Sequence, residues 1–140
     1  AHANTAGNRA HANTAGDDAH ANTAGDGAHA NTAGDGAHAN TAGNRAHANT
    51  AGNRAHANTA GYGAHANTAG EDAVAVSLGS RGVVSADKGW VVLVDWRYDE
   101  GWKIREVHTA KVDADEINGV LIERGKKYWF EEGELRNEKR

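Results

Sequence analysis

One nine-residue unit, Ala-His-Ala-Asn-Thr-Ala-Gly-x-x, repeats eight times in succession from residue 1 to residue 72. Seven of the nine positions are identical in every copy, and only the last two positions vary. A short fixed period is typical of repeat architectures, in which each unit contacts mainly its neighbours. The repeat therefore constrains the fold strongly, because one local structure must suit every unit.

A helix does not suit the unit. Ala favours helix, but each unit also contains Gly, Asn and Thr, and a Gly in a helix interior costs about 1 kcal/mol relative to Ala. The repeat has no apolar stripe that would offset this cost by packing. Disorder stays open as an alternative, because low hydrophobicity favours it and recent duplication of coding DNA would also produce identical units.

A β-solenoid explains more of the pattern. Ala-His-Ala-Asn-Thr-Ala is predicted to be a short extended segment and Gly-x-x a turn, because Gly adopts positive φ without penalty and Asp, Asn and Gly tolerate turn geometry. The three Ala of each unit fit a narrow interior, and the variable turn positions should face solvent. We expect these glycines at the corners: Gly7, Gly16, Gly25, Gly34, Gly43, Gly52, Gly61 and Gly70.

A single nine-residue unit is too short to close a coil, so we expect two units per coil. Four such coils rise about 19 Å at the usual spacing of roughly 4.8 Å between strands. Each side chain then stacks on its copy one coil away, and Asn ladders of this kind hydrogen-bond along the stack. The histidines are predicted to form two ladders, His2, His20, His38 and His56 in one and His11, His29, His47 and His65 in the other.

The second half of the chain has a different composition, because it contains all four Trp and every Val, Leu and Ile. We expect residues 73–89 to form a closing coil with larger side chains, and residues 90–140 to form a small antiparallel β-meander domain. Alternation places these residues on one face of its first strand: Trp90, Val92, Val94, Trp96 and Tyr98.

The rest of the meander is predicted from turn residues and alternation. Residues 99–101 form a hairpin turn, and the next strand has a bulge near Arg105 and Glu106. Two further strands, joined at Gly125, complete the four strands of the meander. The charged tail from Asn137 to Arg140 is expected to fray. The predicted fold class is all-β: a parallel β-solenoid of nine-residue repeats, two per coil, followed by the meander.

The chain resembles a group of phage-associated and bacterial repeat proteins with Ser/Ala-Ala-Asn-Thr-Gly units. Those proteins end in an AVSLG-like segment, a GWVVLVDW-like strand and a small β domain. The segment AVAVSLGSRG…SADKGWVVLVDW is similar, while His at the second unit position departs from the small residues usual there. More distantly, the Ala-x-Ala spacing is similar to the β-roll heads of trimeric autotransporter adhesins. The resemblance implies a solenoid at a virion or cell surface, or outside the cell, and no particular activity.

Composition argues against several function classes. The formal net charge is −4, and no basic cluster is present that would bind nucleic acid or an anionic membrane. Without Cys, disulfides and thiolate metal sites are excluded. No apolar run approaches the roughly 20 residues of a membrane-spanning helix, so we expect no membrane insertion.

The repeat raises three ligand hypotheses. The eight ladder histidines are weak candidates for metal ligands, since imidazole binds Zn²⁺, Cu²⁺ and Ni²⁺, but a uniform ladder lacks a fixed ligand set with supporting partners. A calcium β-roll is disfavoured because the turn is Asn-Arg in three units. The Thr ladders suggest an ice-binding face. The argument against this hypothesis is that each unit has a single Thr beside a bulky His. We therefore expect no resident cofactor or metal.

The sequence contains no recognisable catalytic motif. Asp95, Glu106 and His108 fall on neighbouring predicted strands and can meet, but such residues on a two-sided sheet are most often surface polar groups. The Trp cluster is interpreted as core rather than as a ligand site. We expect no catalytic residues and no enzyme activity.

These observations favour a structural protein that self-assembles into an oligomeric shaft or an extracellular filament, with further copies of itself as its partners. The alternative is a surface-displayed binding or adhesin module, whose solenoid presents a recognition face or the C-terminal domain. Varied turn tips favour the binding module, and uniform lateral faces favour assembly.

Overall fold

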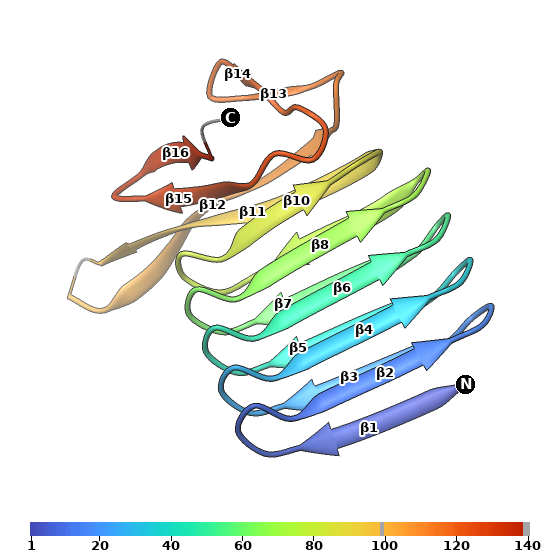
Figure 1. The fold of residues 1–140 in the computed structure, drawn as a ribbon. Helices are drawn as coiled ribbons and strands as arrows, with labels where there is room; N and C mark the ends of the chain where they lie inside the picture. Colours follow the sequence, from blue (N-terminus) through green and yellow to red (C-terminus); the bar gives the residue numbers. More distant parts are fainter. Residues whose placement is uncertain (99, 139–140) are drawn as a thin grey trace.

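The computed structural model describes residues 1–98 and 100–138. Within these ranges all regular structure is β-strand, and no helix occurs. Parallel strands stack into a β-solenoid, and antiparallel strands follow near the C-terminus (Figure 1). The predicted fold class is confirmed.

Each repeat unit forms one five-residue strand followed by a turn. The strands are β1 His2–Ala6, β2 His11–Ala15, β3 His20–Ala24, β4 His29–Ala33, β5 His38–Ala42, β6 His47–Ala51, β7 His56–Ala60 and β8 His65–Ala69. Odd-numbered strands pair in one sheet, called sheet A here, and even-numbered strands pair in a second, sheet B. One coil therefore consists of two units, as predicted.

The stacking is in register throughout the repeat. Each residue pairs with its copy 18 residues away, as His20 does with His38 in β3 and β5. The solenoid continues for a fifth coil, because β9 (Ala73–Ser77) pairs in parallel with β7 and β10 (Val83–Ala86) with β8. The expectation of a closing coil over residues 73–89 agrees with these two strands.

Alternation along each strand separates an inner from an outer face. In the middle coils the second Ala of each unit is fully buried and the Thr is about 5 % exposed, as for Ala39 and Thr41. The His and Asn side chains are only partly buried, and the last Ala of each strand is exposed, so these three positions form the outer face. The expectation that all three Ala of a unit face the interior is therefore wrong for the last one. Small inward side chains let two sheets meet across a narrow interior, where a His would not fit.

The C-terminal strands add to both sheets. In sheet A, β11 (Gly89–Tyr98) pairs in parallel with β9 and forms an antiparallel hairpin with β12 (Trp102–Lys111). In sheet B, β15 (Tyr128–Glu131) pairs antiparallel with β10 and forms a second hairpin with β16 (Glu134–Asn137). A short separate pair, β13 (Glu116–Ile117) and β14 (Val120–Leu121), lies between them in the sequence.

Antiparallel strands occur where they were expected, but they do not form one continuous meander. The two strands expected to be joined at Gly125 do not pair with each other, because β14 pairs with β13, and β15 pairs with β10 and β16. Strands β12 and β15 lie in different sheets, because each open edge of the fifth coil receives its own hairpin. Strand β16 was not predicted from the sequence. The expected fraying from Asn137 is wrong for the two tail residues that the structure describes, because Asn137 pairs with Tyr128 and the Glu138 N–H donates to the carbonyl oxygen of Lys127. Residues 139–140 lie outside the described residues, as does Asp99 of the first hairpin turn. The predicted bulge is confirmed, since Asp95 pairs with Glu106 and Trp96 with Ile104, which leaves Arg105 unmatched.

Larger side chains fill the interior at this closing end. Val84, Leu93 and Tyr128 are almost completely buried, and Ile122 and Phe130 pack in the same cluster as the repeat alanines. The apolar core is therefore thin through the repeat and thick at the last coil. This thick end positions the side chains described next.

Candidate functional surfaces

The conserved glycine of each unit lies in the turn with φ between 120° and 147°. This backbone conformation is accessible almost only to Gly. The successive coils also approach closely here: a Cβ added to Gly43 would lie 2.2 Å from the carbonyl oxygen of Gly25. Both facts explain why the turn glycine is invariant, and they give it a structural role.

The variable turn positions also have a structural explanation. Asp26 Oδ1 accepts a hydrogen bond from the backbone N–H of Asn44 at 3.1 Å, and Asn44 Oδ1 accepts one from the N–H of Tyr62 at 3.1 Å. Either Asp or Asn supplies this oxygen, so the two residues interchange at the eighth position. The ninth position has φ of 53–69° in all eight units, which suits Gly and is tolerated by the Arg and Asp found there. Neither position requires a calcium ion to hold the turn.

The two predicted His ladders are present on the outer faces of the sheets. Neighbouring imidazoles stack with ring centroids 4.7–4.9 Å apart. Beside each His ladder runs an Asn ladder, in which Asn40 Nδ2 donates to Asn22 Oδ1 at 2.8 Å and Asn40 Oδ1 accepts from Asn58 Nδ2 at 2.8 Å. Each flat face thus consists of parallel rows of His, Asn and Ala.

Three ladder histidines have pKa values below the usual value for His. Burial is the main cause that lowers the pKa of His38 and of His47. The charge of neighbouring ladder imidazoles lowers both pKa values further. Burial and the nearby Lys127 ammonium lower the pKa of His65. These causes disfavour the protonated imidazole, so protonation of these three histidines by acid should destabilise the folded state.

The structure brings the histidines into rows but not into clusters of mixed ligands. Within residues 1–98 and 100–138, no group of three or more His, Asp or Glu side chains is arranged to hold a metal ion. The described residues also include no helix able to cross a membrane.

The Thr ladders face the interior. Seven Thr hydroxyls are buried and have no hydrogen-bond partner among the described residues: Thr5, Thr14, Thr23, Thr32, Thr41, Thr50 and Thr68. Thr59 differs because its Oγ1 donates to Ser77 Oγ at 3.1 Å. An ice-binding face requires exposed Thr, and these side chains do not provide one.

The group formed by Asp95, Glu106 and His108 is partly assembled. Glu106 pairs across the hairpin with Asp95, and its Oε2 lies 3.1 Å from His108 Nε2. The His108 ring stacks on Phe130 with centroids 4.9 Å apart. Asp95 is only 3 % exposed, and its closest charged partner is Arg97, whose Nε lies 3.7 Å from Asp95 Oδ2. The arrangement fixes side chains between the two sheets.

The interpretation of the Trp cluster as core is wrong. Trp90 is 41 % exposed and Trp102 is 56 % exposed, and the other two Trp are only partly buried. The alternation in β11 was correct, but the inward face belongs to Val91 and Leu93, which pair with Ala75 and Ser77 of β9 and continue their inner row. The register with β9 therefore turns the Trp-bearing face outward.

An exposed apolar surface results on the outer face of sheet A. We call it the sheet A apolar surface, and its exposed large members are Leu78, Trp90, Ile104 and Val107. At the far end of the β11–β12 hairpin, Tyr98 and Trp102 are also exposed and meet edge to face with centroids 5.6 Å apart. A cavity of about 320 Å³ lies next to this aromatic pair. Sequence reasoning missed both features, although the Trp-rich alternation of residues 90–98 was their signal.

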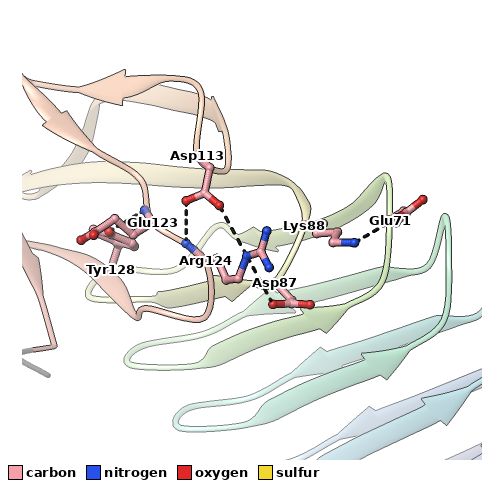
Figure 2. Close-up of polar contacts among 7 residues, drawn as sticks. All are labelled: Glu71, Asp87, Lys88, Asp113, Glu123, Arg124 and Tyr128. Atoms are coloured by element: carbon pink, nitrogen blue, oxygen red, sulfur yellow. Dashed lines mark hydrogen bonds and ion pairs between the residues drawn. The ribbon is translucent and has the colours of Figure 1, made fainter.

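Polar contacts attach the loop between the two hairpins to the fifth coil. Figure 2 shows Arg124, whose N–H donates to Asp113 Oδ1 at 3.2 Å and whose Nε lies 3.5 Å from Asp113 Oδ2 and 4.0 Å from Asp87. The buried Tyr128 hydroxyl accepts the N–H of Glu123 at 2.8 Å and donates to the carbonyl oxygen of Leu121. These contacts hold the loop in place at the closing end.

Comparison of the chain with known protein families, curated proteins and solved structures finds no match. The functional argument therefore depends on the surfaces themselves.

Proposed function

We propose that this chain is a structural, self-assembling solenoid that forms homo-oligomers through the flat outer faces of its sheets. The observation that carries the proposal is the distribution of charge. Every Arg, Asp and Glu of residues 1–72 occupies one of the two variable turn positions. The faces between the turns present only His, Asn and Ala.

Two such faces can pack without burying a charge. Burying an unpaired charge is costly, so charged side chains normally keep sheet surfaces apart. Here that barrier is absent along eight strands. Asn side chains already hydrogen-bond along their own ladder at 2.8 Å, so much of their hydrogen-bonding capacity is satisfied before contact.

The sheet A apolar surface supplies a driving force for association. Its members continue the outer face of the repeat, since Trp90 pairs with Val74 and Val74 with His56 in successive strands. Burial of apolar surface stabilises by about 25 cal/mol per Å², and contiguous exposed apolar patches mark association sites. A second copy of the chain is the partner that suits the uniform, uncharged faces of the repeat together with this apolar surface, whose Trp90 has Lys111 opposite it.

Sedimentation velocity over a range of micromolar concentrations at pH 7.5 tests the proposal, with electron microscopy to distinguish a filament from a closed oligomer. Val107→Lys places a charge within the sheet A apolar surface, where Val107 is 56 % exposed, and should shift the distribution toward monomer. Tyr62→Lys is the matched control, because Tyr62 is 42 % exposed but lies at a turn. A wild-type chain that stays monomeric at every concentration overturns the proposal.

A further inference from the structure

The β11–β12 hairpin extends past the strands of the solenoid. Only Gly89–Leu93 of β11 pair with β9, so the rest of the strand projects beyond it together with its partner β12 (Figure 1). Beneath this overhang lies the cavity of about 320 Å³, a volume at the lower end of the range for small-ligand sites. It is lined by Ser80, Arg81, Trp96, Arg97, Tyr98, Trp102, Phe130 and Glu132.

The aromatic side of the cavity is held in place before any ligand arrives. Trp96 Nε1 donates to the carbonyl oxygen of Leu78 at 2.9 Å, which fixes the indole ring. Phe130 is 4 % exposed and its ring stacks on His108. Tyr98 and Trp102 fix each other by their edge-to-face contact but remain open to solvent. Rigid aromatic side chains lose little entropy when they bind.

The polar side of the cavity is also fixed. Arg97 Nη1 donates to the carbonyl oxygen of Glu132 at 3.1 Å, and Arg97 Nε lies 3.7 Å from the buried Asp95 carboxylate. The guanidinium packs directly on Gly133, where any Cβ would collide with Nη2. A glycine at this position of the β15–β16 turn therefore makes room for Arg97.

The charges around the cavity cancel rather than accumulate. Arg97 faces the Asp95 carboxylate, and Arg81 Nη2 lies 3.5 Å from Glu131 Oε1. Glu132 adds another carboxylate to the lining. An anionic ligand would therefore gain no net attraction, whereas a neutral ligand with hydroxyl groups could accept from the remaining guanidinium N–H groups and donate to Glu132.

We propose that this cavity binds a neutral saccharide. A sugar ring presents an apolar face of C–H groups and a rim of hydroxyls, which are the two surfaces that the cavity offers on its aromatic and polar sides. Trp102 stacks on the ring face, Tyr98, whose ring stands at 72° to that of Trp102, contacts the edge of the sugar, and Ser80, Arg97 and Glu132 contact the hydroxyls. The site uses different side chains from the self-association surface proposed above, and the two adjoin where Ile104 of that surface pairs with Trp96 of the cavity.

The experiment is a titration of the full chain at pH 7.5, followed by tryptophan fluorescence and by saturation-transfer NMR on the sugar. The probes are cellotetraose, maltotetraose, chitotetraose and mannotetraose, with a sulfated heparin tetrasaccharide as the charged comparison. Saturable binding of at least one neutral probe is expected. Binding of none of them, or binding of the sulfated probe alone, overturns the proposal.

Two variants locate the site. Trp102→Ala should weaken binding by at least about tenfold, as expected for an aromatic side chain at the centre of a binding surface. Tyr98→Ala gives an independent second test, because it is also exposed and its loss should not affect folding. Trp90→Ala is the control, since Trp90 is comparably exposed but outside the cavity. Wild-type affinity in both cavity variants overturns the assignment.

The outcomes also separate this proposal from self-assembly. Trp90→Ala should reduce association and leave sugar binding unchanged, while Trp102→Ala should do the reverse. A monomeric chain that binds sugar refutes only the proposed assembly, and an oligomer that binds no sugar refutes only the saccharide site.

Discussion

Replacing Thr41 by Val should stabilise the protein. The Thr41 hydroxyl is buried in the middle of the solenoid and has no hydrogen-bond partner among the described residues. Leaving a hydroxyl buried and unpaired costs about 1–3 kcal/mol, because it loses its bond to water on folding. Val has nearly the same shape and is also β-branched, so it should fill the same space without that cost. We expect the free energy of unfolding to rise by about 1 kcal/mol or more.

The same substitution one coil away should have the opposite sign. Thr59 occupies the equivalent position 18 residues later, but its Oγ1 donates to Ser77 Oγ at 3.1 Å. Thr59→Val removes this bond and leaves the fully buried Ser77 hydroxyl with only a 3.5 Å approach to the carbonyl oxygen of Ala64. The expected loss is about 1–3 kcal/mol.

Urea unfolding at one fixed protein concentration measures both effects, since association would otherwise change the apparent stability. The denaturation midpoint should move in opposite directions for the two variants with similar slopes. A clear destabilisation by Thr41→Val would refute the reasoning, because it would mean that the hydroxyl has a partner. Indistinguishable midpoints for Thr41→Val and wild type would indicate instead that Thr41 faces water.

Three further predictions follow from the turns, the ladders and the loop. Gly43→Ala should destabilise by about 3 kcal/mol or more, because it combines a positive φ with a collision against Gly25 of the preceding coil. Gly7→Ala adds only backbone strain of about 1–3 kcal/mol, so equal midpoints of the two variants in urea would contradict this. The lowered pKa values of His38, His47 and His65 mean that these groups bind more protons in the unfolded chain. The melting temperature should therefore fall as pH drops from 7.5 to 5.5 through the unfolded value of about 6.5, and a flat profile would count against it. Tyr128→Phe should cost about 1–3 kcal/mol in urea unfolding by leaving the Glu123 N–H unpaired, and an unchanged midpoint would show that this contact contributes nothing.

Much of the solenoid could be predicted from the repeat alone. A unit that must stack on identical copies has few solutions, and Gly followed by Asp, Asn or Gly marks the turn. The two His ladders then follow from the expected coil of two units, and their spacing of 4.7–4.9 Å is the ordinary distance between paired strands.

The direction of each face could not be predicted from alternation. In the unit, the second Ala and Thr share one face while His, Asn and the last Ala share the other, so the expectation that all three Ala face the interior is wrong for the last one. In β11 the same ambiguity led to the wrong position for the Trp side chains. Pairing with β9 decides it, because Val91 must continue the inward row of Ala75. Long-range register of this kind is not encoded in a single strand.

Perfect repetition limits where a specific site can form. Away from the ladder ends each His has another His above and below it, so neighbouring positions differ too little to bind a ligand selectively. Selectivity needs side chains that occur once, and these begin where the repeat breaks down, at the fifth coil. There Arg97 contacts Asp95, Glu132 and Gly133 from separate parts of the chain. The regular coils provide uniform faces for assembly, and the irregular end provides the chemistry for recognition.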